Sequence, residues 1–566
     1  MTFDRTLVLA AACALLIAGC GGNASTPRPA TARAAATGNS INPTPRERLR
    51  DGGTFTYAMQ QMPTNFNYSQ IDGVNFDTAR ITDALTPAMF VTDGSGTPTW
   101  NRDYLASEPT LTVTNGQVVT YEINPKAAWY DGTPLTWEDF YWQWKACNGS
   151  DQAYQIASAN GYENIRSVER GKDDREVIVT FEQPYADWQS IFYPLYPAAT
   201  NKDPKVFNTG WQDHPLTTAG PFKFDSIDQT TQTVTLVRNE KWWGAQPKLD
   251  RLVYRSIDIN AHIEALANGE VDAVDVGPSA DKYMRALAIQ GAEIRVAGGP
   301  NFRHLDLNST SPLLADVRVR RALAMAIDRT AIARALLTPL GVPAEPLNNH
   351  IFMTNQNGYR DNSGEVGKYD PEHAARLLDE AGWKLDGTAR RKEGRALEIT
   401  CVIPANTQTA RQETELMQNM LARIGVKMNI DAVPTNDFFD KYVTPGQFDF
   451  TVFAWFGTPY PMSSAKSIYQ NPVVGADGQL DVKQNYARTG SAEIDALFDA
   501  ANAELDHNRA VEIANRADAL IWQEVHSLTL YQRPELFAVK KGLANFGAFG
   551  LQQPWPYVDI GWIAQP

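Results

Sequence analysis

The pattern of apolar residues changes along the chain, and this change constrains the fold more than any other feature of the sequence. From residue 53 to about 257, apolar residues such as Val119, Tyr121 and Ile123 alternate with polar ones, which is typical of strands with one buried face. From residue 306 onward, helices with clear start and stop signals lead directly into strands. The roughly 515 residues after position 51 are too many for one hydrophobic core. The sequence therefore predicts an α/β protein of two or three lobes.

Two helices in the second half of the chain have residues that favour helix ends. Asp370 suits an N-cap and Pro371 suits the first helical position, and Gly382 supplies the stop of the same helix. A second helix over 416–424 is followed at once by an alternating strand over 426–430. A helix followed by a strand is the unit from which α/β lobes are built.

The N-terminal 51 residues look like an export signal and a tether. Residues 1–19 join a short basic start to a twelve-residue apolar run, too short for a permanent membrane span, which predicts a signal peptide. The run ends in IAGC, which resembles a bacterial lipobox, so we expect Cys20 to carry lipid and to hold the protein on the extracytoplasmic face of the cell membrane. Residues 20–51 are rich in Gly, Ser, Thr, Ala and Pro, which predicts a disordered tether.

Composition excludes several classes of function. The net charge of −14, from 51 basic and 65 acidic residues without a basic run, argues against binding to nucleic acid. The seven histidines lack metal-ligand spacing, so we expect no metal and no cofactor. Once Cys13 leaves with the signal and Cys20 is acylated, Cys147 and Cys401 remain, and whether they pair is left open.

The most specific motif lies at residues 129–140, which read WYDGTPLTWEDF. Asp131 and Gly132 form a turn, and Thr136 with Asp139 predicts a capping box at the start of a helix. This segment resembles the WxDGxPLTAxD element of the extracytoplasmic solute-binding proteins of peptide ABC transporters, family 5.

The resemblance continues through nearly the whole ordered chain. Further elements of that family match, in order, residues 218–222 (TAGPF), 238–244 (RNEKWWG), 266–272 (LANGEVD), 307–329, and 369–372. The closest likeness is to oligopeptide-binding lipoproteins of actinobacterial type, helped by PLNNH at 346–350 and DNSG at 361–364.

That family implies a two-lobed periplasmic-binding-protein fold (type II, cluster C) with an additional strand-rich domain. Lobe I would comprise 53–85, 218–305 and 529–566, the extra domain 86–217, and lobe III 306–528. The two lobes would close on the ligand by a hinge movement. The resemblance also implies an oligopeptide ligand, ABC transporter permease subunits as partners, and a monomer.

Peptide-binding members hold an extended ligand between the lobes through backbone hydrogen bonds, which resembles strand addition. Residues 449–456 are nearly all apolar and predict a strand buried on both faces. For Trp455 a core position competes with a ligand contact, and for His304 a structural hydrogen bond does. Arg303 lies in the same wall segment, and Ile71 begins the lobe I segment. The predicted ligand-binding residues are Asp72, Gly73, Val74, Phe302, His304, Ala454, Trp455, Phe456, Gly457, Thr458 and Tyr460.

One position departs from the family pattern. Peptide-binding members place an Asp three residues after this Trp, where it pairs with the α-ammonium of the ligand, and this chain has Thr458 there. Losing one partner of such a contact costs about 3–5 kcal/mol. Either another acid such as Asp72 serves the amine, or the ligand has no free amine.

The sequence therefore predicts a lipid-anchored receptor that delivers oligopeptides to an ABC permease and catalyses nothing. A first alternative is a non-peptide solute: an oligosaccharide, a siderophore-like compound or a glycolipid. A second is a regulatory role in the cell envelope without transport. A third is an acyl-serine hydrolase based on Ser463 and Lys466, whose SxxK spacing is a short match that chance produces easily.

Overall fold

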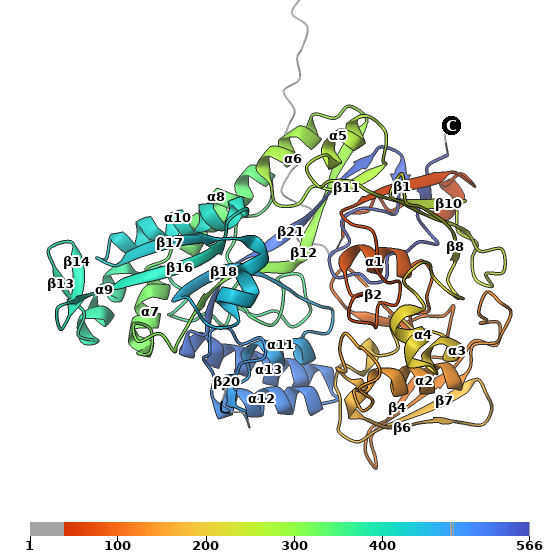
Figure 1. Ribbon diagram of the computed structural model, residues 1–566, viewed down its shortest axis with the longest axis horizontal. Helices are drawn as coiled ribbons and strands as arrows, with labels where there is room; N and C mark the ends of the chain where they lie inside the picture. The colour runs from red at the N-terminus through yellow and green to blue at the C-terminus, as the bar shows by residue number, and fades with distance from the viewer. Residues whose placement is uncertain (1–38, 476–477, 479, 565–566) are drawn as a thin grey trace, which may run out of the picture.

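One continuous mixed sheet of ten strands runs through the computed structural model, which describes residues 39–475, 478 and 480–564. Two long strands, β12 (Ala292–Leu307) and β21 (Ser527–Lys540), cross from lobe III to lobe I (Figure 1). On the lobe III side the sheet continues with β18 (Phe450–Phe456), β16 (Glu398–Pro404) and β17 (Lys427–Val433). On the lobe I side follow β11 (Ala273–Asp275), β1 (Thr54–Met59), β10 (Arg251–Ser256), β9 (Thr233–Arg238) and β8 (Phe222–Asp228).

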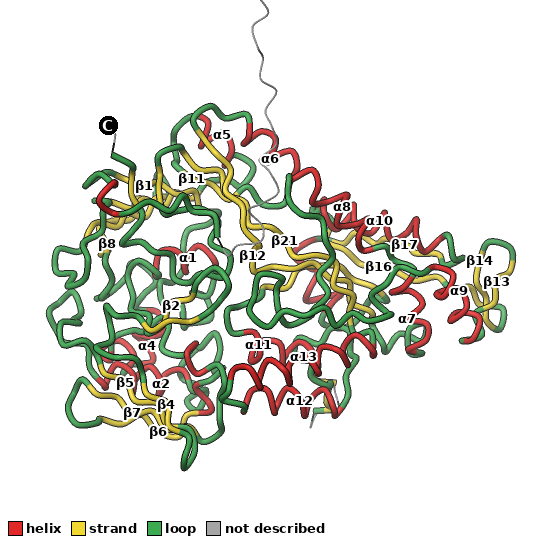
Figure 2. The backbone as a smooth tube through the Cα atoms, turned by 180° about the vertical axis from the view of Figure 1, so that it is seen from behind, coloured by secondary structure: helices red, strands yellow, loops and turns green. Residues whose placement is uncertain are grey.

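Helices cover the sheet, and the two sides differ. Figure 2 shows α5, α6, α8 and α10 in a row along one side of the sheet. Their bounds are His262–Ala267, Ala280–Leu287, Arg329–Leu337 and Gln408–Ala422. Two further helices, α7 (Val317–Met325) and α9 (Pro371–Glu380), pack against each other. Lobe III also contains α11 (Pro461–Tyr469), α12 (Ala492–Ala503) and α13 (His507–Glu524), which lie below β16 and β18 in Figure 1. The largest hydrophobic core extends from Ile263 of α5 to Leu421 of α10 and includes side chains of both crossing strands, such as Leu305 and Leu530.

The extra domain has a sheet and a core of its own. Its strands are β4 (Thr110–Thr112), β5 (Val118–Glu122), β7 (Glu176–Phe181) and β6 (Ile165–Arg170), in that order. The helices α2 (Trp137–Cys147), α3 (Ala198–Asn201) and α4 (Pro204–Thr209) pack nearby. Smaller elements are α1 (Phe76–Thr82), β2 (Phe90–Thr92), β3 (Pro98–Trp100), β13 (Lys384–Asp386), β14 (Ala389–Lys392), β15 (Arg395–Ala396), β19 (Val473–Val474), β20 (Leu480–Asp481), β22 (Leu543–Ala544) and β23 (Gly561–Trp562).

The local signals in the sequence are confirmed. Asp370 caps α9 by accepting from the backbone of His373, and Gly382 follows the helix with φ of +89°. Thr136 and Asp139 form the predicted capping box of α2. Val119 and Tyr121 of β5 are fully buried between half-buried neighbours, as the alternation predicted.

The prediction of a disordered tether is wrong for residues 39–51. Ser40 exchanges two backbone hydrogen bonds with Ala548, at 2.7 and 3.0 Å. Leu49 is buried, and the carbonyl oxygen of Arg48 accepts from Ala564 at 2.9 Å. The polar composition of residues 39–51 does not prevent this packing, because the C-terminal segment offers backbone groups for hydrogen bonds and an apolar surface for Leu49. The predicted signal peptide over 1–19, the lipidation at Cys20 and the tether up to residue 38 lie outside the described residues.

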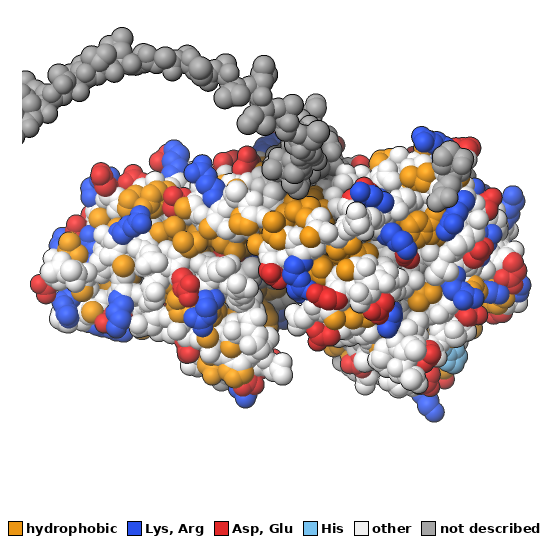
Figure 3. All heavy atoms as spheres, turned by 90° about the horizontal axis from the view of Figure 1, so that it is seen from above, with side chains coloured by type: hydrophobic (Ala, Val, Ile, Leu, Met, Phe, Trp, Pro, Cys, Tyr) orange, Lys and Arg blue, Asp and Glu red, His pale blue; other side chains and the backbone are white. Residues whose placement is uncertain are grey.

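The distribution of surface charge and the polarity of the helices agree with the amino-acid composition of the chain. Figure 3 shows basic and acidic side chains interspersed over the face that carries α5 and α6, without a large area of one sign. In the described part of the chain, no helix combines the length and the apolar character that a membrane crossing requires.

Candidate ligand-binding cleft

The strand β18 has an open edge next to the interlobe region. Gly457 donates to the carbonyl oxygen of Pro300 at 2.7 Å, so the β18 residues with odd numbers turn their backbone groups toward β12. The backbone N–H and C=O groups of Ala454 and Phe456 therefore point to the other edge of β18, away from β12. On that side β16 pairs with β18 at Phe450 and Thr451, and no described strand pairs with the rest of β18. This edge can accept an added strand.

The aromatic side chains at the end of β18 differ in exposure. Trp455 is half-buried and lies stacked between His304 and Tyr486, with ring centroids 5.8 Å away on each side. Phe456 is 69% exposed. The prediction of a strand buried on both faces is therefore wrong at its C-terminal end, where burial decreases from Ala454 to Phe456.

His304 lies below Trp455, with 1% of its surface exposed. Neither ring nitrogen has a hydrogen-bond partner among the described residues, although Nε2 is 3.4 Å from Oδ1 of Asp306. The structural hydrogen bond that was the alternative to a ligand contact is thus not formed, and the buried His304 ring packs against the Trp455 ring. Phe302 is also buried and packs with Leu347 and Met353.

The lobe I segment at 71–74 forms a turn whose backbone is largely engaged. The amides of Asp72 and Gly73 donate to the side chain and the backbone of Gln70, at 2.7 and 3.0 Å. A Cβ at position 73 would lie 2.0 Å from the carbonyl oxygen of Asn67, so this close approach requires glycine. Ile71 and Val74 are 56% and 45% exposed, so this segment offers apolar side chains and the Asp72 carboxylate rather than a run of free backbone groups.

Lobe III and the extra domain touch, so the structure holds the cleft closed at this point. The carboxylate of Asp187 accepts from the backbone N–H of Ser463 in the first turn of α11, at 2.9 Å. The hydroxyl of Tyr460 donates to the carbonyl oxygen of Gln189 at 3.3 Å. Figure 1 shows α11 to α13 meeting the extra domain along its inner side.

A cavity of about 290 Å³ lies at this contact. Its walls come from the extra domain and from three parts of lobe III: the loop around Gln356, the segment 459–462 and the segment 504–507, which includes His507. Of the predicted residues, Tyr460 lines it directly. Thr458 stands beside it, since its carbonyl oxygen accepts from Gln356 at 2.8 Å.

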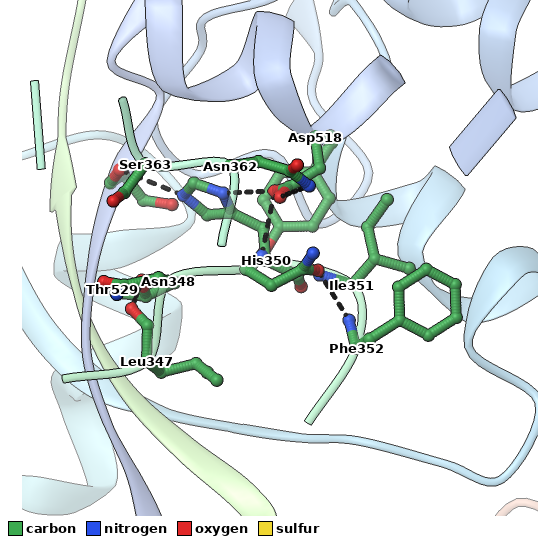
Figure 4. Close-up of polar contacts among 12 residues, drawn as sticks. Leu347, Asn348, His350, Ile351, Phe352, Asn362, Ser363, Asp518 and Thr529 are labelled. Carbon is green, nitrogen blue, oxygen red and sulfur yellow. Dashed lines mark hydrogen bonds and ion pairs between the residues drawn. The ribbon is translucent and has the colours of Figure 1, made fainter. Parts of the chain in front are cut away.

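The loop that lines this cavity is fastened by the motifs at 346–350 and 361–364. Figure 4 shows His350 and Asn362 converging on Asp518 of α13. The His350 ring nitrogen Nδ1 is 2.7 Å from Oδ1 of Asp518, and Asn362 donates to Oδ2 at 2.7 Å. The side-chain oxygen of Asn349 accepts from the amides of the next residues, Ile351 and Phe352. These motifs therefore serve structure, by fixing one wall of the cavity.

The crossing strand β21 carries charged residues that the motifs did not indicate. Arg533 is half-buried and forms no hydrogen bond or ion pair with any described side chain or backbone group. Burial and the nearby guanidinium of Arg303 lower the pKa of Arg533. The sequence signal is the polar stretch QRPE at 532–535, which interrupts an otherwise apolar strand.

Other chemistries left open by the sequence find no support in the geometry. Cys147 and Cys401 are buried, unpaired and in different cores. Lys466 pairs with Asp499, not with Ser463, so the SxxK spacing does not assemble a nucleophile and a base. Within the described ranges, no group of three His, Cys, Asp or Glu side chains could hold a metal ion.

Comparisons with known proteins agree on one family. The model for bacterial extracellular solute-binding proteins, family 5 (middle region), matches residues 103–473. The oligopeptide-binding protein OppA of Mycobacterium tuberculosis is 41% identical over 558 residues, covering 97% of this chain and 92% of OppA. The periplasmic EDTA-binding protein EppA is 27% identical, with a TM-score of 0.84 over 94% of this chain and all of EppA.

A more distant structure has the same fold. The oligopeptide-binding protein AppA of Bacillus subtilis, solved with a nonapeptide, is 20% identical, with a TM-score of 0.71 over 91% of this chain and 100% of AppA. The predicted α/β fold of two lobes with an additional strand-rich domain is thereby confirmed.

Proposed function

We propose that this chain, which belongs to the bacterial extracellular solute-binding proteins of family 5, captures oligopeptides outside the cell and delivers them to an ABC transporter permease. The family consists of binding receptors rather than enzymes. In this proposal the receptor is a monomer anchored to the extracytoplasmic face of the membrane by lipid on Cys20.

The open edge of β18 is the observation that carries the peptide assignment. An extended peptide beside Ala454 and Phe456 would complete the hydrogen bonds that β16 does not make there. Because main-chain pairing ignores side-chain identity, such a site accepts peptides of many sequences. The likeness to OppA, whose name states an oligopeptide ligand, points the same way.

Peptides that are N-methylated at one position test this pairing without changing the receptor. In an added strand every second residue turns its N–H toward the receptor, so we expect affinity to fall at least about 10-fold at alternate positions. Methylation at the positions between them should change affinity less than about threefold. Calorimetric titration of a pentapeptide series measures this, and a uniform loss along the peptide would contradict strand addition.

A non-peptide anion is the second candidate. The likeness to EppA, whose name states EDTA as its ligand, covers nearly the whole chain, and Arg533 is a cation without a partner among the described residues. A polyanionic solute in the cleft would compensate that charge. Binding of EDTA that is lost in Arg533→Gln, together with no binding of any pentapeptide, would replace the peptide proposal with this one.

The anchoring proposal rests on the sequence, since Cys20 lies outside the described residues. Cys20→Ser removes the only thiol that the lipobox-like segment offers for acylation. We expect the protein to move from the membrane fraction to the soluble fraction or the medium, because no other part of the proposal provides a lipid. Fractionation in high salt, with Cys147→Ser as the matched control, measures the shift. A Cys20→Ser protein that still sediments with membranes would refute lipid anchoring.

A further inference from the structure

The cavity between the extra domain and lobe III contains a carboxylate, that of Asp187, with no ion-pair contact to any described residue, although His507 also lines the cavity. Asp187 has 4% of its surface exposed, and one of its oxygens accepts from the amide of Ser463. Among the described residues, no Lys, Arg or His nitrogen lies within 4.0 Å of this carboxylate, as an ion pair would require. The other acid of the cavity, Glu504, already pairs with Arg509 at 3.0 Å.

Burying a carboxylate without a cation costs free energy, and the raised pKa of Asp187 reflects this cost. Burial raises the pKa of Asp187, while the amide and hydroxyl of Ser463 and the charge of His507, which also lines the cavity, act in the opposite direction. Hydrogen bonds from one serine compensate a buried charge less well than a cation in direct contact does. The site therefore has electrostatic room for one positive charge.

Aromatic side chains form the walls around this carboxylate. Trp188 is 9% exposed and follows Asp187 in the chain, and Tyr460 lies across the contact from it. Aromatic faces attract ammonium groups, and the effect is larger where water is excluded. The polar groups of Gln356 and Thr97 also line the cavity and can accept further N–H bonds.

The cavity also lies where a ligand strand on β18 would end. One part of its lobe III wall begins at Pro459, three residues after the end of β18 at Phe456. Pro459 also lies close to Gly96 of the extra domain, since a Cβ atom added at Gly96 would be 3.2 Å from the Cα of Pro459. A peptide that runs antiparallel to β18 would bring its N-terminus to this end of the strand.

We propose that this cavity binds a primary ammonium group, with Asp187 as its counter-charge and Trp188 and Tyr460 as its aromatic walls. This inference rests on the proposed function. In this chain Asp187 would pair with the amine of the ligand, in place of the Asp that peptide-binding members have at the position of Thr458. The ammonium comes either from the N-terminus of the peptide or from a lysine side chain near it. Asp72, in contrast, is exposed and accepts from Gln70 at 3.1 Å.

Asp187→Asn removes the charge and keeps an oxygen that can accept from Ser463, so the closed contact is retained. With the wild type, we expect N-acetylation of a lysine-free pentapeptide to weaken binding about 10- to 100-fold. With Asp187→Asn, the free and acetylated peptides should bind within about threefold of one another. Glu182→Gln makes the same change of charge on an exposed side chain of the same domain, and it should behave as the wild type.

The outcomes separate the possible roles. If acetylation has no effect but replacing a lysine by norleucine weakens binding in the wild type alone, the ammonium is that of the side chain, and the site stands. If Asp187→Asn weakens free and acetylated peptides equally, Asp187 serves closure only, and the proposal is overturned.

A failure of the peptide assignment would give a result distinct from a failure of the ammonium site. If no peptide binds the wild type, the proposed function fails, and 1,4-diaminobutane is then used as the probe of the cavity. A rise in melting temperature for the wild type but not for Asp187→Asn would support the ammonium site without peptides. The absence of any rise would overturn it.

Discussion

Glu413→Gln is expected to lower the free energy of unfolding by about 3–5 kcal/mol, because it leaves the buried Arg303 guanidinium without its counter-charge. Glu413 is fully buried on α10 and accepts from Nε of Arg303 on β12, at 3.0 and 3.2 Å. The hydroxyl of Tyr531 on β21 donates to the same carboxylate at 2.6 Å. This group therefore joins α10 to both crossing strands.

Urea unfolding followed by tryptophan fluorescence measures the loss. Glu512→Gln breaks an exposed ion pair with Arg360 on the same lobe, and it should cost far less stability, because solvent screens an exposed pair. The double variant Arg303→Met with Glu413→Leu should recover much of the stability, because the cost comes from the unpaired charge rather than from lost attraction. A loss for Glu413→Gln no larger than that of the Glu512→Gln control would contradict this account.

The sequence predicted those parts of the fold that depend on near neighbours. The cap at Asp370, the stop at Gly382 and the capping box of Thr136 and Asp139 each involve residues a few positions apart, so their patterns are visible in the chain itself. The family resemblance supplied the arrangement of the lobes, which no local pattern could give.

The parts that the sequence did not predict depend on distant neighbours. Asp187 and Ser463 are 276 positions apart, and nothing in either segment indicates that they meet. The exposure of Phe456 depends on which distant segments pack over the end of β18, which the apolar run at 449–456 could not show. Residues 39–51 are ordered by the C-terminal segment, more than 500 positions away in the chain for Thr44 and Asn545.

Glu535 makes the stability of the protein depend on pH in a direction that can be worked out. It lies on β21, where one of its oxygens accepts from the amides of Phe549 and Gly550 at 2.6 and 2.8 Å. Burial raises the pKa of this carboxyl from 4.5 to about 7, and the nearby Asp275 adds to the rise, while Arg80 and the two amides oppose it. The folded state therefore binds the proton more tightly than the unfolded state does.

It follows that the contribution of Glu535 to stability is fully present below about pH 4.5 and is lost as the pH rises through about 7. Between pH 4 and 8, the wild type should lose about 3 kcal/mol relative to Glu535→Gln, whose amide keeps an oxygen acceptor but does not titrate. Urea unfolding of both proteins at steps of pH measures this difference, and Glu182→Gln should show no such relative change because its side chain is exposed. Parallel pH profiles for the wild type and Glu535→Gln would mean that the two amides and Arg80 fully compensate the buried charge.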